Sequence, residues 1–239
     1  MFGHREVRLG VGAAITDRHG GVSGSPYDSL NLADHVGDDA SAVTENRRRV
    51  ASALGLTGVA TMRQVHGAGV AVVDGVTDDP PEADALVTRA AGVGLVVLVA
   101  DCTPVLLWDR RAGVVAAVHV GRRGLAAGVL PAAIEVMAGL HARPDRMYAV
   151  VGPSVCPEHY EVPIDMRDDV AATSPAAAAV SAAGAPALDI RAGLLAQLQD
   201  AGLRQWMVMP QCTAEAPGYF SYRRDGTTGR FAGLVWREA

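Results

Sequence analysis

Residues 93–124 read VGLVVLVADCTPVLLWDRRAGVVAAVHVGRRG, and no other stretch of the sequence says as much about the fold. It contains three apolar runs, at 93–100, 105–109 and 114–120, which are separated by short polar breaks. Runs of this length that are rich in valine and leucine are typical of strands buried on both faces. We therefore expect a buried sheet within an α/β protein, with the polar breaks at the ends of its strands.

On either side of this stretch, the hydrophobic pattern predicts further strands and three helices. The expected strands are 7–15, 59–65, 69–74, 83–88, 147–151 and 206–209, and the expected helices are 45–54 with Thr44 as its N-cap, 124–140 and 188–203. The strands 59–65 and 69–74 would meet near His66 as a hairpin.

Two segments carry weaker patterns. Residues 171–187 are rich in alanine and proline, which predicts a mobile loop or a short helix. In the segment 219–236, a turn at Asp225 and Gly226 separates two strand-like runs. Neither a repeat nor a domain boundary is visible in the sequence, so we predict one α/β domain over residues 1–239.

The overall composition argues against nucleic acids and membranes as main partners. The formal net charge is −5, the wrong sign for binding nucleic acid or an anionic membrane surface. No apolar run reaches the roughly 18 residues of a membrane-spanning helix, and the first residues lack the pattern of a signal peptide. We therefore expect a cytoplasmic protein, whose three widely spaced cysteines are free thiols.

The chain contains no lysine, because all 21 basic residues are arginine. Schiff-base chemistry, pyridoxal phosphate attachment and a Walker-type phosphate loop each need a lysine amine, so these classes are excluded. If the protein binds phosphate, then arginine side chains, backbone N–H groups or a metal must do so.

Three chemically active side chains lie at the ends of apolar runs. Cys102 follows the run 93–100, His119 ends the run 114–120 just before a glycine-flanked turn, and His66 ends the upstream run in RQVHG. A cysteine with two histidines can be a thiolate nucleophile with its base. The same three side chains can also form an open zinc site with a fourth position for water or substrate. The residues alone leave both chemistries open.

Two further motifs accompany this group. Cys156 and His159 form a C-x-x-H pair, which is a weak metal signal without a second pair, and we interpret it as no metal site. Arg223, Arg224 and Arg230 surround a glycine-containing turn and could cradle an anion, or form a solvated hairpin tip. The aromatic side chains of Tyr219, Phe220 and Tyr222 could stack on a planar base.

Several blocks together resemble the laccase-domain family of YfiH-like proteins. The matching blocks, in order, are GGVSGSPYDSLNLADHVGDD with ENRRR, RQVHG, ADALVT, ADCTPVLLWD, VAAVHVGRRG, GPSVCPEHYEV and CTAEAPGYFSYRRDGTTGR. Members are described as polyphenol oxidoreductases, purine nucleoside phosphorylases and peptidoglycan-editing factors. The resemblance implies a single layered α/β domain, YfiH-like and cysteine-hydrolase-like, with helices packed on mixed β-sheets.

The resemblance also implies a function and a metal. It implies a zinc-dependent purine nucleoside phosphorylase that converts adenosine, inosine and methylthioadenosine with phosphate into ribose 1-phosphate and the free base, with adenosine deaminase activity in addition. The implied zinc ligands and catalytic residues are His66, Cys102 and His119. The partners would then be small molecules, with no nucleic acid or membrane, and the protein would be a monomer or a homodimer.

Within this interpretation, four further residues are candidates for substrate binding. They are Arg63 and Arg123 for phosphate, and Asn31 and Asp101 as orienting groups. The chain departs from the family at Arg122, where the family has a tryptophan, and it lacks the adjacent cysteines that the family often has near Glu158 and His159.

Three alternatives remain beside the phosphorylase. A metal-free hydrolase could use Cys102 and His119 on amide bonds, as in peptidoglycan editing. Copper-dependent phenol oxidation needs many histidines, commonly in H-x-H pairs, whereas the seven histidines of this chain contain no such pair. A non-enzymatic role as a partner of cell-envelope or division machinery is the third.

Overall fold

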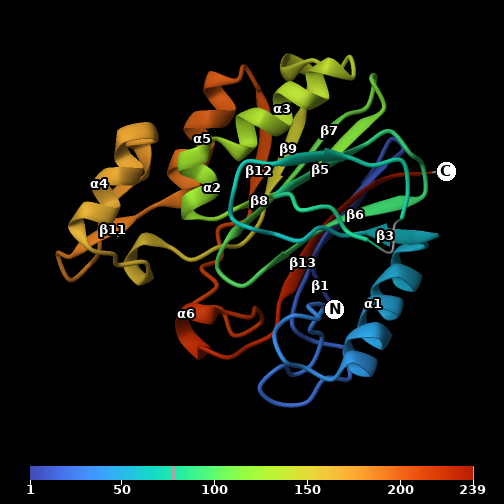
Figure 1. Ribbon diagram of the computed structural model, residues 1–239, viewed down its shortest axis with the longest axis horizontal. Coiled ribbons are helices and arrows are strands. Elements are labelled where there is room, and N and C mark those ends of the chain that lie inside the picture. The colour runs from blue at the N-terminus through green and yellow to red at the C-terminus, as the bar shows by residue number, and fades with distance from the viewer. Residues whose placement is uncertain (77–78, 239) are drawn as a thin grey trace.

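The computed structural model describes residues 1–76 and 79–238, and they form four layers in the order helix, sheet, sheet, helix (Figure 1). A six-stranded sheet and a five-stranded sheet lie face to face, and helices cover the outer face of each. This confirms the expectation of an α/β fold with helices on mixed sheets. That residues 1–239 form one domain stays a prediction.

The six-stranded sheet has the strand order β12-β9-β7-β8-β5-β4. Its strands are β4 (Val70–Val72), β5 (Ala85–Thr88), β7 (Thr103–Asp109), β8 (Val114–Val120), β9 (Tyr148–Val151) and β12 (Gln205–Val208). The pairs β9–β12 and β4–β5 are parallel, and the pairs between them are antiparallel. Its outer face carries α2 (Arg122–Ala127), α3 (Val129–Gly139) and α5 (Ile190–Asp200).

The five-stranded sheet has the strand order β1-β2-β13-β6-β3. Its strands are β1 (Phe2–Arg8), β2 (Val11–Thr16), β3 (Gly58–Ala60), β6 (Val93–Val99) and β13 (Phe231–Arg237). The helix α1 (Ala40–Leu54) lies on its outer face (Figure 1). The first and last strands of the chain therefore belong to the same sheet.

The apolar runs of 93–120 form β6, β7 and β8, each buried along its whole length, as predicted. Side chains of a strand alternate between its two faces, and both faces are covered here. In β7, Val105 and Leu107 pack against the helices, while Leu106 and Trp108 pack between the sheets. Continuous hydrophobicity is thus the signature of the middle layers in this four-layer structure.

Two predictions about strands were wrong, one because the chain turns within the segment and the other because the chain passes to the second sheet. The expected strand 7–15 is a hairpin of β1 and β2, and its two turn residues, Leu9 and Gly10, both have positive φ, at 52° and 84°. The segments 59–65 and 69–74 form no hairpin. Instead, β3 pairs with β6 and β4 pairs with β5, so the chain crosses from one sheet to the other between them.

The helix predictions were correct in place and wrong at their ends. The helix α1 begins at Ala40, because Asp39, not Thr44, accepts hydrogen bonds from Ser41 and Ala42 as the N-cap. The expected helix 124–140 is divided into α2 and α3 at Gly128, whose φ of 77° ends the first helix.

The remaining segments form short elements, of which those between residues 157 and 188 lie at one end of the molecule and the one at 222–225 lies below the sheets (Figure 1). These are η1 (Pro144–Arg146), η2 (Pro157–His159), α4 (Ile164–Thr173), η3 (Pro175–Ala177), β10 (Ala178–Val180), β11 (Pro186–Leu188) and α6 (Tyr222–Asp225). The segment 171–187 contains the short helix η3, as one of the two predicted alternatives has it, followed by most of the hairpin β10–β11, which was not predicted. The first strand-like run of 219–236 is instead a turn leading into α6, which Ser221 caps. Within the described residues, the helices are too short or too polar to cross a membrane.

Asp109 ties the turn after β7 to the segment that leads into β9. It is buried, with 1% of its side chain exposed, and Oδ1 accepts hydrogen bonds from the N–H groups of Arg111 and Ala112. Oδ2 accepts from the N–H of Arg143 and from the guanidinium of Arg146. Burial tends to raise the pKa of this carboxyl, but these donors outweigh burial and hold it below the usual value.

The substitution Asp109→Asn should lower the free energy of unfolding by about 2–4 kcal/mol at pH 7, because its amide turns a donor toward Arg143 and Arg146. Since the pKa is depressed in the folded state, the carboxylate stabilises fully above its unfolded value of about 3.9, and this contribution is lost as the pH falls through the folded value. Urea unfolding of both proteins at pH 7 and below pH 4 measures the effect. A difference that did not shrink at low pH would contradict it.

Candidate metal centre and the cavity around it

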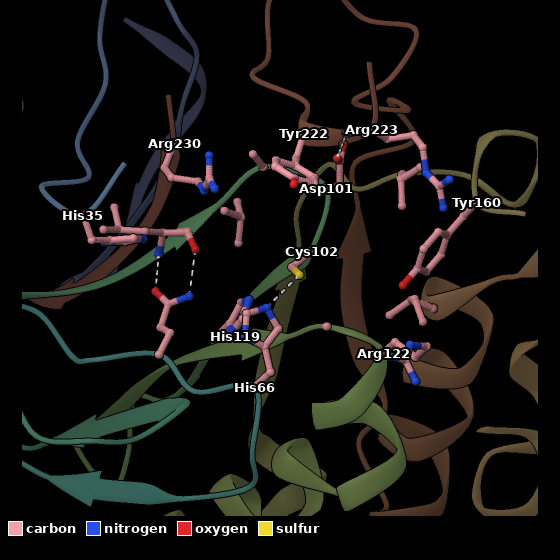
Figure 2. A pocket seen from close by; sticks show the side chains of 17 residues that line it. His35, His66, Asp101, Cys102, His119, Arg122, Tyr160, Tyr222, Arg223 and Arg230 are labelled. Atoms are coloured by element: carbon pink, nitrogen blue, oxygen red, sulfur yellow. Dashed lines mark hydrogen bonds between the residues drawn. The ribbon is translucent and has the colours of Figure 1, made fainter. Parts of the chain in front are cut away.

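His66, Cys102 and His119 lie together at one end of the two sheets (Figure 2). One donor atom of each residue lies within 4.8 Å of a donor atom of the other two. Cys102 Sγ is 3.9 Å from His66 Nε2, and the two imidazole rings meet edge to face with centroids 4.7 Å apart. His119 is buried, Cys102 is half-buried and His66 is exposed, so the group opens to solvent on one side.

The sheet register places Cys102 and His119 next to each other. In the antiparallel pair β7–β8, Pro104 is opposite His119 and Thr103 is opposite Val120. Cys102 directly precedes Thr103, so it lies at the start of β7 beside the end of β8. The convergence of these two strand-end residues therefore follows from the antiparallel pairing of β7 with β8.

His66 reaches the pair from the crossover between β3 and β4, where a buried carboxylate holds its loop. Asp84 Oδ1 accepts a hydrogen bond from the His66 N–H at 2.9 Å, and Oδ2 accepts from the Gly67 N–H at 2.6 Å. The same Asp84 Oδ1 lies 2.8 Å from His119 Nδ1. One carboxylate thus positions both histidines.

Gln64 adds a second anchor to this loop. Its side chain donates to the Leu98 carbonyl oxygen and accepts from the Leu98 N–H, both at 2.8 Å. The Gln64 side chain thus makes the two hydrogen bonds to β6 that a paired strand would make, and it joins the His66 loop to β6. His66 itself has a φ of 61°, which a residue with a side chain seldom adopts and which these anchors stabilise.

The electrostatics favour a thiolate at Cys102. Burial alone would raise the pKa of the thiol, but the His119 and His66 imidazoles lower it to about 6. Burial would likewise lower the pKa of His119, whereas the Cys102 thiolate and the Asp84 carboxylate raise it. Asp84 also directs His119 Nδ1, which leaves Nε2 of that ring as the nitrogen available to a ligand.

The three donors fit a zinc ion. Two imidazole nitrogens and one thiolate sulfur are ligands that zinc accepts, and three protein ligands with one open position are typical of catalytic zinc. A carboxylate behind a ligating histidine, as Asp84 lies behind His119, is the usual outer partner in such sites. Gly121 leaves the necessary room, because a Cβ there would lie 2.9 Å from Cys102 Sγ and 3.1 Å from His66 Cδ2.

These three residues line a cavity of about 660 Å³, which is large enough for a nucleoside. Three arginines, Arg122, Arg223 and Arg230, also line it. Figure 2 shows Arg230 on one side of Cys102, and Arg223, Tyr160 and Arg122 on the other. The guanidinium of Arg223 lies over the ring of Tyr160, 5.3 Å from its centroid.

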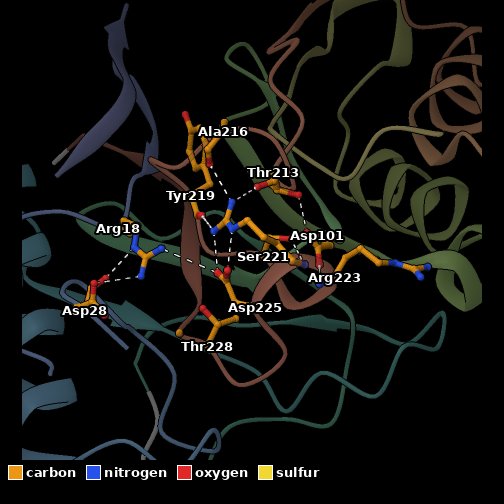
Figure 3. Close-up of polar contacts among 12 residues, drawn as sticks. Arg18, Asp28, Asp101, Thr213, Ala216, Tyr219, Ser221, Arg223, Asp225 and Thr228 are labelled. Carbon is orange, nitrogen blue, oxygen red and sulfur yellow. Dashed lines mark hydrogen bonds and ion pairs between the residues drawn. The ribbon is translucent and has the colours of Figure 1, made fainter. Parts of the chain in front are cut away.

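Asp101 lies in the cavity wall and is held by the polypeptide on the opposite side (Figure 3). The Thr213 hydroxyl donates to Asp101 Oδ1 at 2.6 Å, and the Arg223 N–H donates to Oδ2 at 2.7 Å. Its φ of 94° is again unusual for a residue with a side chain. Arg224 points away from the cavity and donates to the carbonyl oxygens of Thr213 and Tyr219.

Of the residues predicted from the sequence, the structure brings His66, Cys102, His119 and Asp101 into one cavity. The other three do not line it. Arg63 is exposed and paired with Asp79 at 2.9 Å, and Arg123 is exposed on α2. Asn31 is buried behind the wall, where its Oδ1 accepts from the Arg230 N–H and so positions that residue.

The structure divides the residues interpreted as an anion cradle and as stacking groups. Arg223 and Arg230 line the cavity together with Tyr222, whereas Arg224 does not line it and donates to the Thr213 carbonyl oxygen. Tyr219 and Phe220 are 6% and 0% exposed and belong to the core between the sheets, so they cannot stack on a ligand.

Sequence reasoning missed Asp84, Gln64 and Tyr160, and it assigned phosphate to Arg123 although Arg122 is the one that lines the cavity. An acid directly before a buried strand, as in ADALVT, is a usable signal for Asp84, because a buried carboxylate needs several donors. Gln64 and Tyr160 carry no comparable signal, since only the tertiary structure brings them to the cavity.

Comparisons with known proteins agree on one family. The family model described as "Multi-copper polyphenol oxidoreductase laccase" matches residues 12–238. The chain is 52% identical to purine nucleoside phosphorylase SCO2081 of Streptomyces coelicolor, covering 99% of each chain. It is 39% identical to purine nucleoside phosphorylase YfiH of Shigella flexneri, covering 95% of this chain and 94% of that protein.

Among solved structures, the chain is similar to the Neisseria meningitidis protein NMB0706. The TM-score is 0.88 at 38% identity, and the match covers 97% of this chain and 96% of that one. The fold described above is therefore the fold of this family.

The substitution Asp84→Asn should weaken the binding of added Zn²⁺ to this candidate site by about 10–100-fold and lower the free energy of unfolding by about 2–4 kcal/mol. The asparagine side chain would place an N–H group against the Gly67 N–H or the His119 ring N–H, where the carboxylate accepts a hydrogen bond. Competition with a chelator measures the affinity and urea unfolding the stability. The control Asp79→Asn removes an exposed carboxylate and should change stability by no more than about 0.5 kcal/mol. Equal zinc affinities for the two variants would contradict the role of Asp84.

Proposed function

The chain belongs to the multi-copper polyphenol oxidoreductase laccase family, and we propose that it is a zinc-dependent purine nucleoside phosphorylase. Its substrates would be adenosine, inosine and methylthioadenosine, with phosphate as the second substrate. One observation carries the proposal: a metal-type group of two histidines and a cysteine faces three arginines across one cavity. The name of the Streptomyces coelicolor relative supports the same activity.

The arginines account for phosphate binding in a chain without lysine. Guanidinium groups bind phosphate oxygens through paired hydrogen bonds, and they stay charged at all physiological pH values. Arg122, Arg223 and Arg230 approach the cavity from different segments of the chain, so a phosphate between them would be held from several directions. This arrangement would fix the phosphate for attack at C1′ of the ribose as the bond to the purine breaks.

The nucleoside would occupy the remaining space between aromatic and polar walls. Tyr160 and Tyr222 line the cavity and could pack on a purine ring. The Asp101 carboxylate keeps lone pairs beyond those used by Thr213 and Arg223, so it could accept a hydrogen bond from a ribose hydroxyl. Enclosure in this cavity would keep water away from C1′ and favour phosphorolysis over hydrolysis.

His66, Cys102 and His119 would hold the zinc ion. Bound zinc supplies a Lewis acid and lowers the pKa of a bound water toward neutrality. Asp84 keeps both histidines in position and His119 in one tautomer. Deamination of adenosine at C6 would use the same three residues, which is why we include adenosine deaminase activity in the proposal.

One observation favours a second candidate, a metal-free hydrolase of amide bonds. Cys102 has a pKa of about 6 and lies beside an imidazole, which is the arrangement of a cysteine nucleophile and its base. Copper-dependent phenol oxidation is less compatible with the donors, because the thiol and two imidazoles of this cavity cannot build a multi-copper ligand set.

An assay for release of the base from adenosine and inosine separates these candidates. It is run on purified protein with and without phosphate, before and after treatment with a chelator. We expect activity that needs phosphate, is lost with the chelator and returns with zinc, and that Cys102→Ala abolishes. Release of base without phosphate would contradict the phosphorylase. Hydrolysis of amide bonds that survives chelation and stops on thiol alkylation would establish the hydrolase instead.

The phosphate assignment is tested by two adjacent arginines. Arg122 lines the cavity, whereas its neighbour Arg123 is exposed outside it. We expect Arg122→Ala to raise the KM for phosphate by about 10–100-fold, the loss of a charge-assisted hydrogen bond, and Arg123→Ala to leave it unchanged. Steady-state kinetics at saturating nucleoside measure both. An effect of Arg123→Ala alone would instead support the assignment made from the sequence.

A further inference from the structure

A second group of metal-type donors lies outside the cavity, and we propose that it is a structural zinc site. We call it the loop cluster: Cys156, His159, Cys212 and Glu215. One donor atom of each lies within 4.8 Å of a donor atom of every other member. The proposed occupant is a single zinc ion with all four positions filled by protein side chains.

The parallel strands β9 and β12 bring the loop cluster together. Their paired ends, Val151 and Val208, lead into loops that leave the sheet at the same edge. The pairing continues beyond the strands as a bridge between Ser154 and Cys212, with the Thr213 N–H donating to the Ser154 carbonyl oxygen at 3.1 Å. The two loops therefore run side by side where the four donors lie.

Each loop contributes two donors from one tight turn. The His159 N–H donates to the Cys156 carbonyl oxygen at 3.0 Å, and the Glu215 N–H donates to the Cys212 carbonyl oxygen at 3.2 Å. Side chains three residues apart in such a turn point the same way. The sequence interpretation rejected a metal here because C-x-x-H lacked a second pair. The structure supplies that pair as Cys212-Thr-Ala-Glu215.

The distances suit tetrahedral zinc. Zn–S bonds of about 2.3 Å and Zn–N or Zn–O bonds of about 2.0 Å place neighbouring donor atoms roughly 3.3–3.8 Å apart. His159 Nδ1 lies 3.3 Å from Cys156 Sγ, 3.9 Å from Cys212 Sγ and 3.4 Å from Glu215 Oε1. Every other pair of donor atoms lies within 4.8 Å, so shifts of about 1 Å in the side chains would bring all four to the spacing of a zinc site.

The donor types of the loop cluster indicate which cation it would hold. A divalent metal stabilises the thiolates that coordinate it. Two sulfur donors select zinc over magnesium or calcium, which prefer oxygen alone.

The burial pattern suggests a structural role and a route for the metal. Cys212 is buried and Cys156 is half-buried, while His159 and Glu215 retain 42% and 59% exposure. The sulfur atoms thus form the inner side, and the imidazole and carboxylate close the site from solvent. A site with four protein ligands leaves no open position for a substrate.

The loop cluster adjoins the wall of the proposed active site. Val155 and Tyr160 line the cavity and directly flank Cys156 and His159 in the chain. On the other loop, Thr213 follows Cys212 and donates to Asp101. Zinc joining these loops would therefore fix the position of Tyr160 and Asp101, although none of its own ligands lines the cavity.

Zinc content in a Cys102→Ala background tests the proposal without interference from the first site. Protein purified under reducing conditions and loaded with Zn²⁺ should retain about one zinc ion per chain, and Cys102→Ala/His159→Ala should retain none. The control Cys102→Ala/His19→Ala removes an exposed histidine outside both groups and should retain the metal. Elemental analysis after gel filtration measures all three. Equal zinc in the first two proteins, or none in Cys102→Ala, would overturn the site.

A milder variant and a spectroscopic probe distinguish the loss of a metal ligand from misfolding. Glu215 is largely exposed, so Cys102→Ala/Glu215→Gln should fold normally. Chelator competition should show that it binds Zn²⁺ at least about tenfold more weakly.

Co²⁺ bound to Cys102→Ala should show thiolate-to-cobalt charge-transfer absorption, which Cys156→Ser in the same background should reduce. Absence of that absorption, or a Cys156–Cys212 disulfide in the reduced preparation by mass spectrometry, would refute zinc ligation. Because Cys102→Ala lacks phosphorylase activity under the proposed function, these results are independent of it.

Discussion

The ionised carboxylate of Asp84 is the constraint on which the proposed site depends. It is fully buried, and burial of a charge is unfavourable unless several donors compensate it. The donors are the N–H groups of His66 and Gly67 and the ring of His119, and together they outweigh burial and lower the pKa of Asp84. The same bonds that make the charge tolerable bring two histidines beside Cys102. Stability and site geometry thus share one set of interactions.

The arrangement of the sheets explains why the site lies where it does. The hairpin β7–β8 belongs to the six-stranded sheet, whereas the run before Cys102 forms β6 of the five-stranded sheet. The chain also passes between the sheets at the loop of His66. Both crossings occur at polar breaks, because the apolar runs are confined to the buried layers. His66 and Cys102 therefore lie where the chain passes from one sheet to the other. The loops after β9 and β12 close the cavity from the other side.

Much of the fold and part of the site could be predicted from the sequence. Continuous apolar runs identify strands with two covered faces, and the hairpin of β7 and β8 makes Cys102 and His119 neighbours by register. Prediction failed where residues next to each other in the chain point in different directions. Arg122 and Arg123 begin the same helix, but successive side chains on a helix point about 100° apart, so only Arg122 reaches the cavity. Leu9 could not be recognised as a turn residue, because leucine seldom adopts positive φ.

Composition and local periodicity were sufficient for the α/β class, the excluded lysine chemistries and the three residues at the strand ends. Which charged groups meet depends on tertiary packing. Asp84 and His119 are separated by 35 residues, Asp101 and Thr213 by 112, and Asn31 and the backbone of Arg230 by 199. Local pattern carries no information on such pairs, since packing of the two sheets creates them. The pairing of Cys156 and His159 with Cys212 and Glu215 arises in the same way, from two parallel strands that end at one edge.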